Sequence, residues 1–446
     1  MTLVLTLPAG PIGAVLEVSS PGGAVMCPAL LVSSLGLVTQ PAWFVDGTTG
    51  NDNATGATLA TALKTLAEFS RRMRGATLVG SFTQPNEAQI QVNLSGSFDV
   101  TDQLYLDGLF LYDTTSLVIQ GTVTNTALVA TITNVVGLGS GGGNPFTLTT
   151  TGVDWTTTPE RRILLSGGFT AWIGRVIDAN NITISNPNTT PLNGQTVTVQ
   201  TTTVIPNMFC NIGAQPRQNA QALNSQFRKV LIFDVLIGVP KNIISTVEIP
   251  PLNLLGSARY FLNRCKIVTG LIQGNGVTTS TCQFIPSSAT NSPRLEVYAQ
   301  NFEFGFCSIA KNPAAINNHT LQLLLGSSIS FRSVYSEGVG VLCVDPGVQL
   351  LIAAGNTHIQ NSPVDGLRLN AGTQVVNNSN GRLSGTANAG FGINAGGGGV
   401  FGYFGAVDKP TITGASGDTA VVGVVKAYAA IPFVNNPLFS GIYQFS

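Results

Sequence analysis

The stretch Gly366-Leu367-Arg368-Leu369-Asn370-Ala371-Gly372 decides the fold, because similar stretches lie on either side of it. They are Val341-Leu342-Cys343-Val344-Asp345-Pro346-Gly347 and Gly390-Phe391-Gly392-Ile393-Asn394-Ala395-Gly396. Each contains apolar residues two apart, then Asp or Asn, a small residue or Pro, and Gly, and the steps between them are 25 and 24 residues. A strand and turn recurring at a nearly constant interval indicate a repeating unit that stacks on its neighbours.

Further strands follow each of these turns. A second strand is expected at residues 348–352, 373–376 and 399–401, and a third around Ile359, Leu383 and Ile412. Two or three strands in about 20–30 residues, with Gly, Asn and Asp at the corners, are typical of a right-handed parallel β-helix. An antiparallel sandwich also alternates strands and turns, but it does not require one order of residues to recur at a fixed interval. We therefore favour the β-helix.

Composition limits the classes of partner. Only 9% of the 446 residues are charged, against roughly 25% in an average soluble protein. The 21 basic and 21 acidic residues cancel and form no long run, so no electrostatic footprint for nucleic acid or an anionic membrane is present. No apolar run approaches the roughly 20 residues that cross a bilayer. A neutral surface of hydroxyl and amide groups favours a chain that is part of a larger assembly.

The cysteines predict no metal site. The six lie at positions 27, 210, 265, 282, 307 and 343, without CxxC pairs or nearby histidines. Buried free thiols are the favoured interpretation, and disulfides are the alternative. Cys282 and Cys307 are 25 residues apart, so a β-helix places them one coil apart, where they can stack in the interior.

An N-terminal segment is expected to cover one open end of the β-helix. Thr61 is expected to cap a helix whose apolar face includes Leu63, Leu66, Ala67, Ser70 and Met73, and Gly75 ends it. Arg71, Arg72 and Arg74 lie where the helix dipole favours cations, and phosphate binding is the less favoured alternative. An exposed end would otherwise invite aggregation, which predicts a lid here.

This segment also resembles a known family. Trp43-Phe44-Val45-Asp46, then Gly50-Asn51-Asp52-Asn53 and Gly56, then Ala60-Thr61-Ala62-Leu63-Lys64-Thr65-Leu66, resemble the N-terminal segment of pectate-lyase-like β-helix proteins, particularly phage tailspikes and related virion proteins. Leu59 stands where that family usually has proline. The resemblance implies a homotrimer, attachment to other virion proteins and a host polysaccharide as ligand. It covers about 30 residues directly and indicates fold more specifically than function.

The chain divides into five expected parts. Residues 1–40 form an N-terminal docking segment, 41–138 the capping helix and first coils, 139–205 a small inserted antiparallel β-domain, 206–425 the main β-helix, and 426–446 a C-terminal cap or intersubunit tail. The inserted domain follows a glycine-rich linker at 139–143 and contains several short alternating strands. Its fold class is therefore all-β, like that of the coils.

No catalytic, cofactor-binding or metal-binding residues are predicted, and the substrate-binding residues are unknown. The two histidines, His319 and His358, lack a nucleophile motif, and the run Gly396–Gly399 has no helix after it and fits a coil corner. A glycosidase or lyase needs paired carboxylates or an acidic calcium cluster. The nearest candidates show no such spacing and are better interpreted as structural; they are Asp345, Asp365, Glu303 and Glu337, with Arg332 nearby. Trp155 and Trp172 could stack on sugars, although core packing is favoured.

The favoured hypothesis is a non-enzymatic phage virion protein, a β-helical spike or tailspike-like component for attachment to host-surface glycans. One alternative is a capsid decoration or vertex protein. The other is a polysaccharide-degrading tailspike, either a glycosidase or a lyase. The alternating N-terminus, Met1 to Pro8, has no basic leader and predicts a strand instead of a signal peptide, so a virion location after synthesis in a host cytoplasm is expected, without cofactors or membrane insertion.

Overall fold

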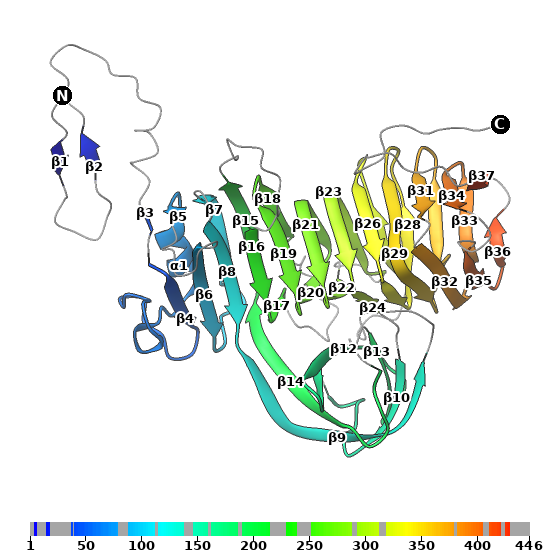
Figure 1. Ribbon diagram of the computed structural model, residues 1–446, viewed down its shortest axis with the longest axis horizontal. Helices are drawn as coiled ribbons and strands as arrows, with labels where there is room; N and C mark the ends of the chain where they lie inside the picture. The colour runs from blue at the N-terminus through cyan, green and yellow to red at the C-terminus, as the bar shows by residue number, and fades with distance from the viewer. Residues whose placement is uncertain are drawn as a thin grey trace, which may run out of the picture.

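A computed structural model describes most of the chain. The described residues are 4–6, 15–17, 37–38, 40–78, 88–111, 115–137, 146–158, 162–185, 190–214, 229–238, 251–287, 292–311, 318–378, 381–404, 410–420 and 424–428. They form a long stack of parallel strands with an antiparallel barrel beside it, and one short α-helix (Figure 1). The all-β prediction is confirmed, and the parallel stack is β-helix-like.

Three parallel ladders form the stack. From Leu104 to Gly414 each turn of the chain passes from ladder 1 to ladder 2 to ladder 3, whereas the described strands before Leu104 belong to ladders 1 and 2 alone. Ladder 1 contains β3 (Leu37–Val38), β5 (Thr77–Leu78), β7 (Leu104–Leu111), β15 (Met208–Ala214), β18 (Leu252–Gly256), the first half of β21 (Leu271–Ser280), the first half of β23 (Arg294–Gly305), β25 (His319–Leu323), β28 (Val339–Cys343), β30 (Leu367–Asn370), β33 (Phe391–Gly397) and β36 (Gly417–Ala420).

Ladder 2 contains β4 (Ala42–Asp46), β6 (Ala88–Ser95), β8 (Thr115–Gly121), β16 (Lys229–Phe233), β19 (Arg259–Asn263), the second halves of β21 and β23, β26 (Ser328–Arg332), the first half of β29 (Gln349–Gln360), β31 (Gln374–Asn377), β34 (Val400–Phe404) and β37 (Val424–Tyr428). Ladder 3 contains the end of β14 (Thr196–Ile205), β17 (Val235–Ile237), β20 (Lys266–Thr269), β22 (Gln283–Pro286), β24 (Ser308–Ala310), β27 (Tyr335–Glu337), the second half of β29, β32 (Gly381–Asn388) and β35 (Thr411–Gly414).

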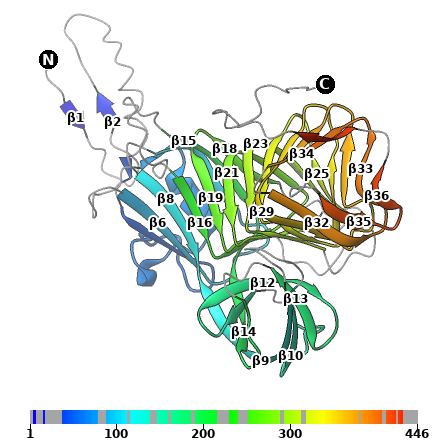
Figure 2. The same cartoon turned by 45° about the vertical axis from the view of Figure 1, so that its right-hand side comes forward.

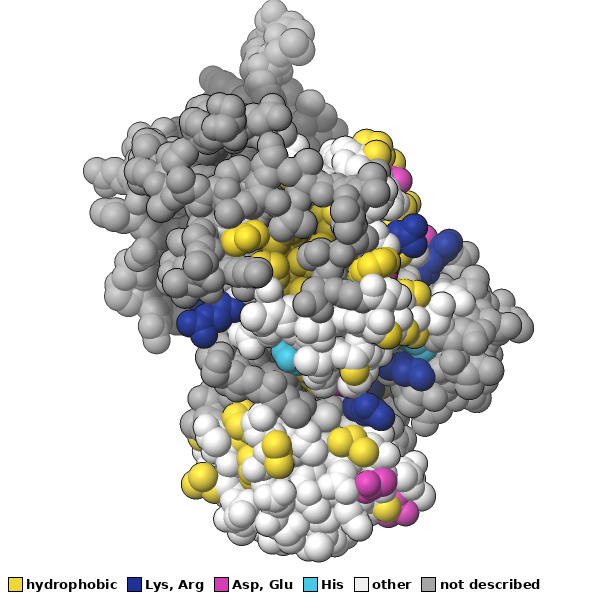
Figure 3. Space-filling model, turned by 90° about the vertical axis from the view of Figure 1, so that its right-hand side faces the viewer, with side chains coloured by type: hydrophobic (Ala, Val, Ile, Leu, Met, Phe, Trp, Pro, Cys, Tyr) yellow, Lys and Arg dark blue, Asp and Glu magenta, His cyan; other side chains and the backbone are white. Residues whose placement is uncertain are grey.

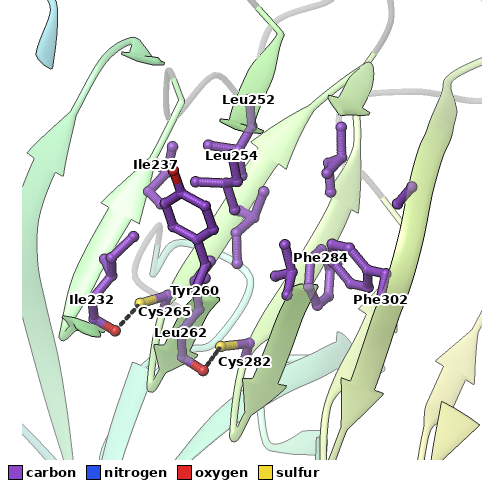
Figure 4. Packing of buried hydrophobic residues seen from close by; sticks show 14 of the residues in the cluster. Ile232, Ile237, Leu252, Leu254, Tyr260, Leu262, Cys265, Cys282, Phe284 and Phe302 are labelled. Atoms are coloured by element: carbon purple, nitrogen blue, oxygen red, sulfur yellow. Dashed lines mark hydrogen bonds between the residues drawn. The ribbon is translucent and has the colours of Figure 1, made fainter. Parts of the chain in front are cut away.

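The inward side chains of the three ladders form one continuous apolar core. Cys265, Cys282 and Cys307 lie in one column of it, because the residues that follow them pair from coil to coil. Their thiols are buried and free, and those of Cys265 and Cys282 each donate a hydrogen bond to a carbonyl of the preceding coil at 3.4 Å (Figure 4). The stacking expected of Cys282 and Cys307 is therefore confirmed.

Single residues with positive φ form the corner between ladder 2 and ladder 3. In successive coils these corner residues are Asp234, Arg264, Thr281, Phe306, Ser333 and Gly355, with φ between 45° and 72°. Glycine is needed at the last of them, because a Cβ on Gly355 would lie 2.0 Å from the Ser333 hydroxyl. A one-residue corner lets the chain turn sharply while the ladders stay in register.

The strand register corrects two details of the expected repeat. Val341 pairs with Leu367 and Leu367 with Ile393, so the ladder 1 steps are 26 residues each, not 25 and 24. Asn394 therefore matches Arg368 within a strand and does not form the turn, which lies at Gly398 (φ 88°) inside the glycine run. Leu383 likewise pairs with Thr357, not with Ile359. Corners of different length absorb the extra residues, and the sequence shows no sign of where they do so.

Six antiparallel strands close into a barrel beside ladder 3 (Figures 1 and 2). The order around it is β9 (Val123–Gly137), β10 (Phe146–Thr151), β13 (Asn181–Ser185), β12 (Phe169–Val176), β11 (Arg162–Leu165), β14 and back to β9. The barrel has its own core, which includes Trp155. Its hydrogen bonding begins at Val123, ahead of the boundary expected at residue 139; the division into domains remains a prediction.

The barrel is inserted directly after a single corner residue of the coil, Gly121. In the next coil only Asp234 separates Phe233 from Val235, and these two pair with Gln120 and Thr203. The chain therefore leaves the stack after Gly121 and returns at Thr203. The two ends meet, because Thr203 N donates to Thr122 O at 3.0 Å and Thr122 N donates to the Thr203 hydroxyl at 3.0 Å.

The loop and helix after β4 cover the first described coil. Phe44 and Asp46 of β4 form backbone hydrogen bonds with Gly56 and Leu63, which occupy the free edge of the strand. Helix α1 (Leu66–Met73) then buries Leu66, Phe69, Ser70 and Met73 against the core. Its N-cap is Thr65, and the expectation of Thr61 is wrong: Thr61 ends a separate 3-10 turn, η1 (Leu59–Thr61).

Carboxylates fix the start of α1. Asp52 accepts from Lys64 N and Thr65 N at 2.8 and 2.9 Å, and Asp102 accepts from Leu66 N and Ala67 N at 2.8 and 3.0 Å. Leu66 N and Ala67 N are among the donors that a helix start leaves without intrahelical partners, and Asp52 fixes the two residues just before the helix. The helix therefore begins where two separate segments supply acceptors, which Thr61 lacks.

Several sequence predictions lie outside the described residues. The first is the docking segment, of which only Gln40 and the backbone of β1 (Val4–Thr6), β2 (Val15–Glu17) and β3 are described. The others are the linker at 139–143, Cys27 and nearly all of the tail at 426–446. They stay predictions.

Candidate functional site at the seam between barrel and coils

The barrel packs on the outward face of ladder 3, along a line of contacts that we call the seam. Four outward residues of ladder 3 form an apolar stripe there: Leu236, Val268, Ile285 and Ala310. From β12, Trp172 Nε1 donates to the Thr281 carbonyl at 2.9 Å, and Gln283 Nε2 donates back to the Ile173 carbonyl at 2.7 Å. The seam therefore combines apolar burial with hydrogen bonds that fix its register.

A buried ion network anchors one end of the seam. Asp234 accepts from Arg162 of β11 and from Arg264 of the next coil, each at 2.7 Å, and from Gln120 at 2.9 Å. Burial raises the pKa of Asp234, but the bonds from Arg264 and Gln120 and the charge of Arg162 outweigh it and lower the pKa overall. Arg162 is only 4% exposed, so the pair must stay together to remain buried.

A second polar cluster, the Glu337 cluster, lies at the other end. Glu337 is 2% exposed and accepts from Gln360 Nε2 at 2.7 Å, from Asn361 Nδ2 at 2.8 Å and from the Tyr335 hydroxyl. Arg175 of the barrel reaches the same carboxylate at 3.4 Å. Burial, followed by the charge of Glu337, raises the pKa of Tyr335, so its phenol stays protonated as a donor.

His358 extends this cluster along ladder 3. Gln360 uses its amide nitrogen on Glu337 and on the Tyr335 oxygen, so its carbonyl oxygen faces His358 Nε2 at 2.9 Å and that nitrogen carries the proton. The Ser384 hydroxyl lies 2.9 Å from both His358 Nδ1 and Asn356 Oδ1 and has one proton to share. Burial lowers the pKa of His358, against the bond to Gln360 and the charge of Glu337.

The Glu337 cluster bridges the barrel and the coils through Arg175. Two-carboxylate glycoside hydrolysis needs a second carboxyl group about 5–10 Å from the first. Within the part of the chain that the structure describes, no second carboxylate is hydrogen-bonded to this cluster. Every oxygen of Glu337 is already engaged by donors, so the carboxylate holds the barrel to the coils. Lys and Arg side chains lie at separate places on the face shown in Figure 3, some of them where the barrel meets the coils, and the barrel surface there is mostly uncharged apart from a few acidic side chains.

The other carboxylates considered from the sequence do not join Glu337. Asp345 accepts from Leu325 N at 2.9 Å, and Asp365 accepts from Phe391 N and Asn394 Nδ2 at 2.8 Å each. The bond to Asp345 holds a coil corner, and the two bonds to Asp365 tie it to the strand of the next coil. Glu303 lies on the outer face of ladder 2, and the Arg332 guanidinium, one coil further, stacks 5.3 Å from the centre of the Phe306 ring.

The contacts of the aromatic and basic candidates are those of structural residues. Trp155 is fully buried in the barrel core, where its Nε1 donates to Thr150 at 2.6 Å, and Trp172 lies in the seam. His319 is fully buried at the start of β25. Arg71 and Arg72 both pair with Glu68 at 2.7 Å, and Arg74 is exposed. Hydrogen bonding from Arg71, in spite of some burial, lowers the pKa of Glu68 to about 2.

Sequence reasoning missed most of the seam. Arg162, Arg175, Tyr335 and Gln360 carry its bonds, and none belongs to a motif. The only signal was alternation: Tyr335 and Glu337, like His358 and Gln360, are two apart and so share one face of a strand.

Neither a metal site nor a membrane-spanning helix is found in the described ranges. No group of three or more His, Cys, Asp or Glu in them is arranged to hold a metal ion. No helix among them is both long and apolar enough to cross a membrane.

Comparisons with known proteins give distant structural similarities and no sequence match. No protein-family model matches the chain, and no curated protein matches it. The Gp54 tailspike of Acinetobacter baumannii bacteriophage AP22, solved in complex with capsular saccharide, is similar at 10% identity and a TM-score of 0.24, over 81% of this chain and 65% of the tailspike. The native GH136 lacto-N-biosidase from Eubacterium ramulus is similar at 8% identity and a TM-score of 0.23, over 87% and 68%. At these scores neither likeness carries an argument about function.

Proposed function

We propose that the protein is a non-enzymatic phage virion component, a spike that attaches to host-surface glycans through its rigid β-helix. The observation that supports a non-enzymatic role is the state of Glu337, which is buried and whose two carboxylate oxygens are both engaged by hydrogen-bond donors. A stack of parallel ladders is a stiff scaffold for displaying hydroxyl and amide side chains at a fixed spacing. In the same proposal the coils are right-handed, as parallel crossover connections nearly always are.

The proposed assembly is a homotrimer attached to the particle by residues 1–40. Cryo-electron microscopy of particles that contain this chain tests the location, and trimers at the tail are the expected result. Binding of the purified full-length chain to a panel of capsular polysaccharides and lipopolysaccharides tests the ligand. Binding without release of reducing ends or unsaturated sugars agrees with the proposal, and release would favour the polysaccharide-degrading alternative.

The barrel surface favours a capsid decoration or vertex protein as the second candidate. Eight large hydrophobic side chains of the described residues are exposed, and five of them, Leu128, Val129, Val136, Ile177 and Leu192, belong to the barrel segment. Exposed apolar side chains concentrated on one module favour a protein contact over a glycan contact. Coils lying on the capsid shell in the same micrographs, with the barrel against a neighbouring protein, would support this candidate and overturn the spike.

A further inference from the structure

A row of side chains on the outer face of ladder 1 shares no residue with the seam. It contains Tyr105, Phe209, Asn253, Gln273 and Tyr298, one from each of five successive coils, paired in that order. We call it the outer row. Its four steps of about 4.8 Å give a length of about 19 Å, which is the span of an oligosaccharide more than of a single sugar.

Asn253 is the unusual member of the outer row. Its side chain is 8% exposed, and its Nδ2 donates to the Pro251 carbonyl at 3.4 Å. Its Oδ1 is buried and has no hydrogen-bond partner. An orphaned buried acceptor costs about 1–3 kcal/mol, so such a group in a native protein requires an explanation. A ligand that donates a hydrogen bond to Oδ1 would supply it.

The neighbours of Asn253 define the chemistry of that ligand. The Tyr105 and Phe209 rings stack at 4.6 Å with 13° between their planes, so they turn their edges, not their faces, outward. Ring edges carry partial positive charge and attract oxygen lone pairs. Gln273 adds an amide that can both donate and accept. Hydroxyl groups match all of these partners.

The charges at the two ends of the outer row bear on the class of sugar. Asp107 lies at one end of the outer row, bonded to Tyr105 at 3.5 Å and to Asn211 at 3.0 Å. Glu296 lies at the other end, on the same face of β23 as Tyr298, and it engages the nearby Arg294 at 2.8 Å. Burial and the charges of Glu296 and Asp345 raise the pKa of Tyr298, in keeping with carboxylates close to this end. The Asp107 carboxylate repels an anionic sugar at its end of the row, whereas the charge of Glu296 is offset by Arg294. The net charge along the row therefore favours a neutral sugar over a uronic acid.

We propose that the outer row binds a neutral, hydroxyl-rich oligosaccharide, with Asn253 Oδ1 accepting from a sugar hydroxyl. The inference rests on the proposed attachment function and names its site and its substrate class. Asn253 is then a residue that lowers the stability of the free protein and contributes to binding. Its replacement by an apolar residue separates these two effects.

The test measures binding and stability of the full-length chain together. The probes are immobilised neutral hexose and N-acetylhexosamine oligomers, with uronic-acid oligomers as the anionic comparison. The expected result is binding of a neutral probe, at least a tenfold loss of that binding in Asn253→Leu, and a raised melting temperature for the same variant. Gln322→Leu is the matched control on β25 of the same ladder, outside the outer row, and should keep binding. Gln273→Ala is a second variant, expected to weaken binding while the fold is retained.

Each of the other outcomes overturns either the outer row as a binding site or both proposals. Unchanged binding in Asn253→Leu and Gln273→Ala, or preference for the uronic-acid probes, overturns the outer row as a neutral-sugar site and leaves glycan attachment standing. Failure of the wild-type chain to bind any probe or any polysaccharide of the larger panel overturns both proposals.

Discussion

The strands of the coils and the strands of the barrel pair their backbone N–H and C=O groups in different ways. Each coil pairs with the coils above and below, so the first described coil needs a separate cover, which the loop and helix after β4 provide. The six barrel strands instead close on themselves and leave no edge. The two parts have separate cores, and they meet through the chain at Gly121 and Thr203 and through the seam. The difference teaches that an edge-free domain can be inserted into an open stack at a corner without disturbing the ladders on either side.

Deleting the barrel tests most directly whether the stack of coils is independent of it, and this change has the largest expected effect. Deleting residues 122–202 joins Gly121 directly to Thr203 and recreates the arrangement Phe233-Asp234-Val235 of the next coil. We expect a coil stack that keeps its β-sheet circular dichroism and cooperative unfolding. Val268→Thr and Ile285→Thr should be added to make the uncovered stripe polar. An aggregated or unfolded product even with these substitutions would show that the stack needs the barrel.

The ion network at the seam gives the next largest effect. Asp234→Asn keeps the size of the residue and tolerates its positive φ of 56°, but it removes the charge that Arg162 needs. Loss of one partner of a buried ion pair should lower the free energy of unfolding by about 3–5 kcal/mol. Denaturant unfolding measures this. Asp178→Asn, in an exposed turn of the barrel, is the control and should cost about 1 kcal/mol or less; equal losses in both variants would contradict the buried network.

Replacing one corner residue should raise the stability of the coils and leave the barrel unchanged. Thr281 is β-branched and holds a φ of 53°, a conformation that costs about 1–2 kcal/mol for a non-glycine residue. Thr281→Gly should therefore raise the free energy of unfolding by about 1 kcal/mol, and the carbonyl that accepts from Trp172 remains. Thr278→Gly within β21, the strand that ends just before Thr281, is the control and should destabilise. A lower melting temperature for Thr281→Gly would show that the corner is not strained.

The pH dependence at His358 is the smallest expected effect. Its pKa in the folded protein is lowered, so unfolding takes up a proton between that pKa and the unfolded value of about 6.5. The stability contribution is complete above about pH 6.5 and is lost as the pH falls below it. Melting temperatures between pH 7 and pH 5 should fall more for the wild type than for His358→Gln. An NMR titration that places the pKa of His358 above 6.5 would contradict the sign.

The sequence predicted the fold better than the site, for physical reasons. Inward positions such as Leu367, Leu369 and Ile393 must be apolar at every coil, so the repeat is visible. Corners tolerate extra residues, so the register was wrong by one or two positions. The seam depends on Arg175 and Glu337, which are 162 residues apart, and no local pattern relates them. The helix start was wrong because its acceptors, Asp52 and Asp102, come from distant segments.

The junction at Gly121 and Thr203 has a consequence for how such a chain can change over generations. One continuous stretch of coding sequence specifies the whole barrel, and its two boundaries meet within hydrogen-bonding distance. Recombination at these boundaries can exchange one closed domain for another while every coil keeps its partner. The surface that the stack presents can therefore be renewed in a single genetic event, without a new scaffold.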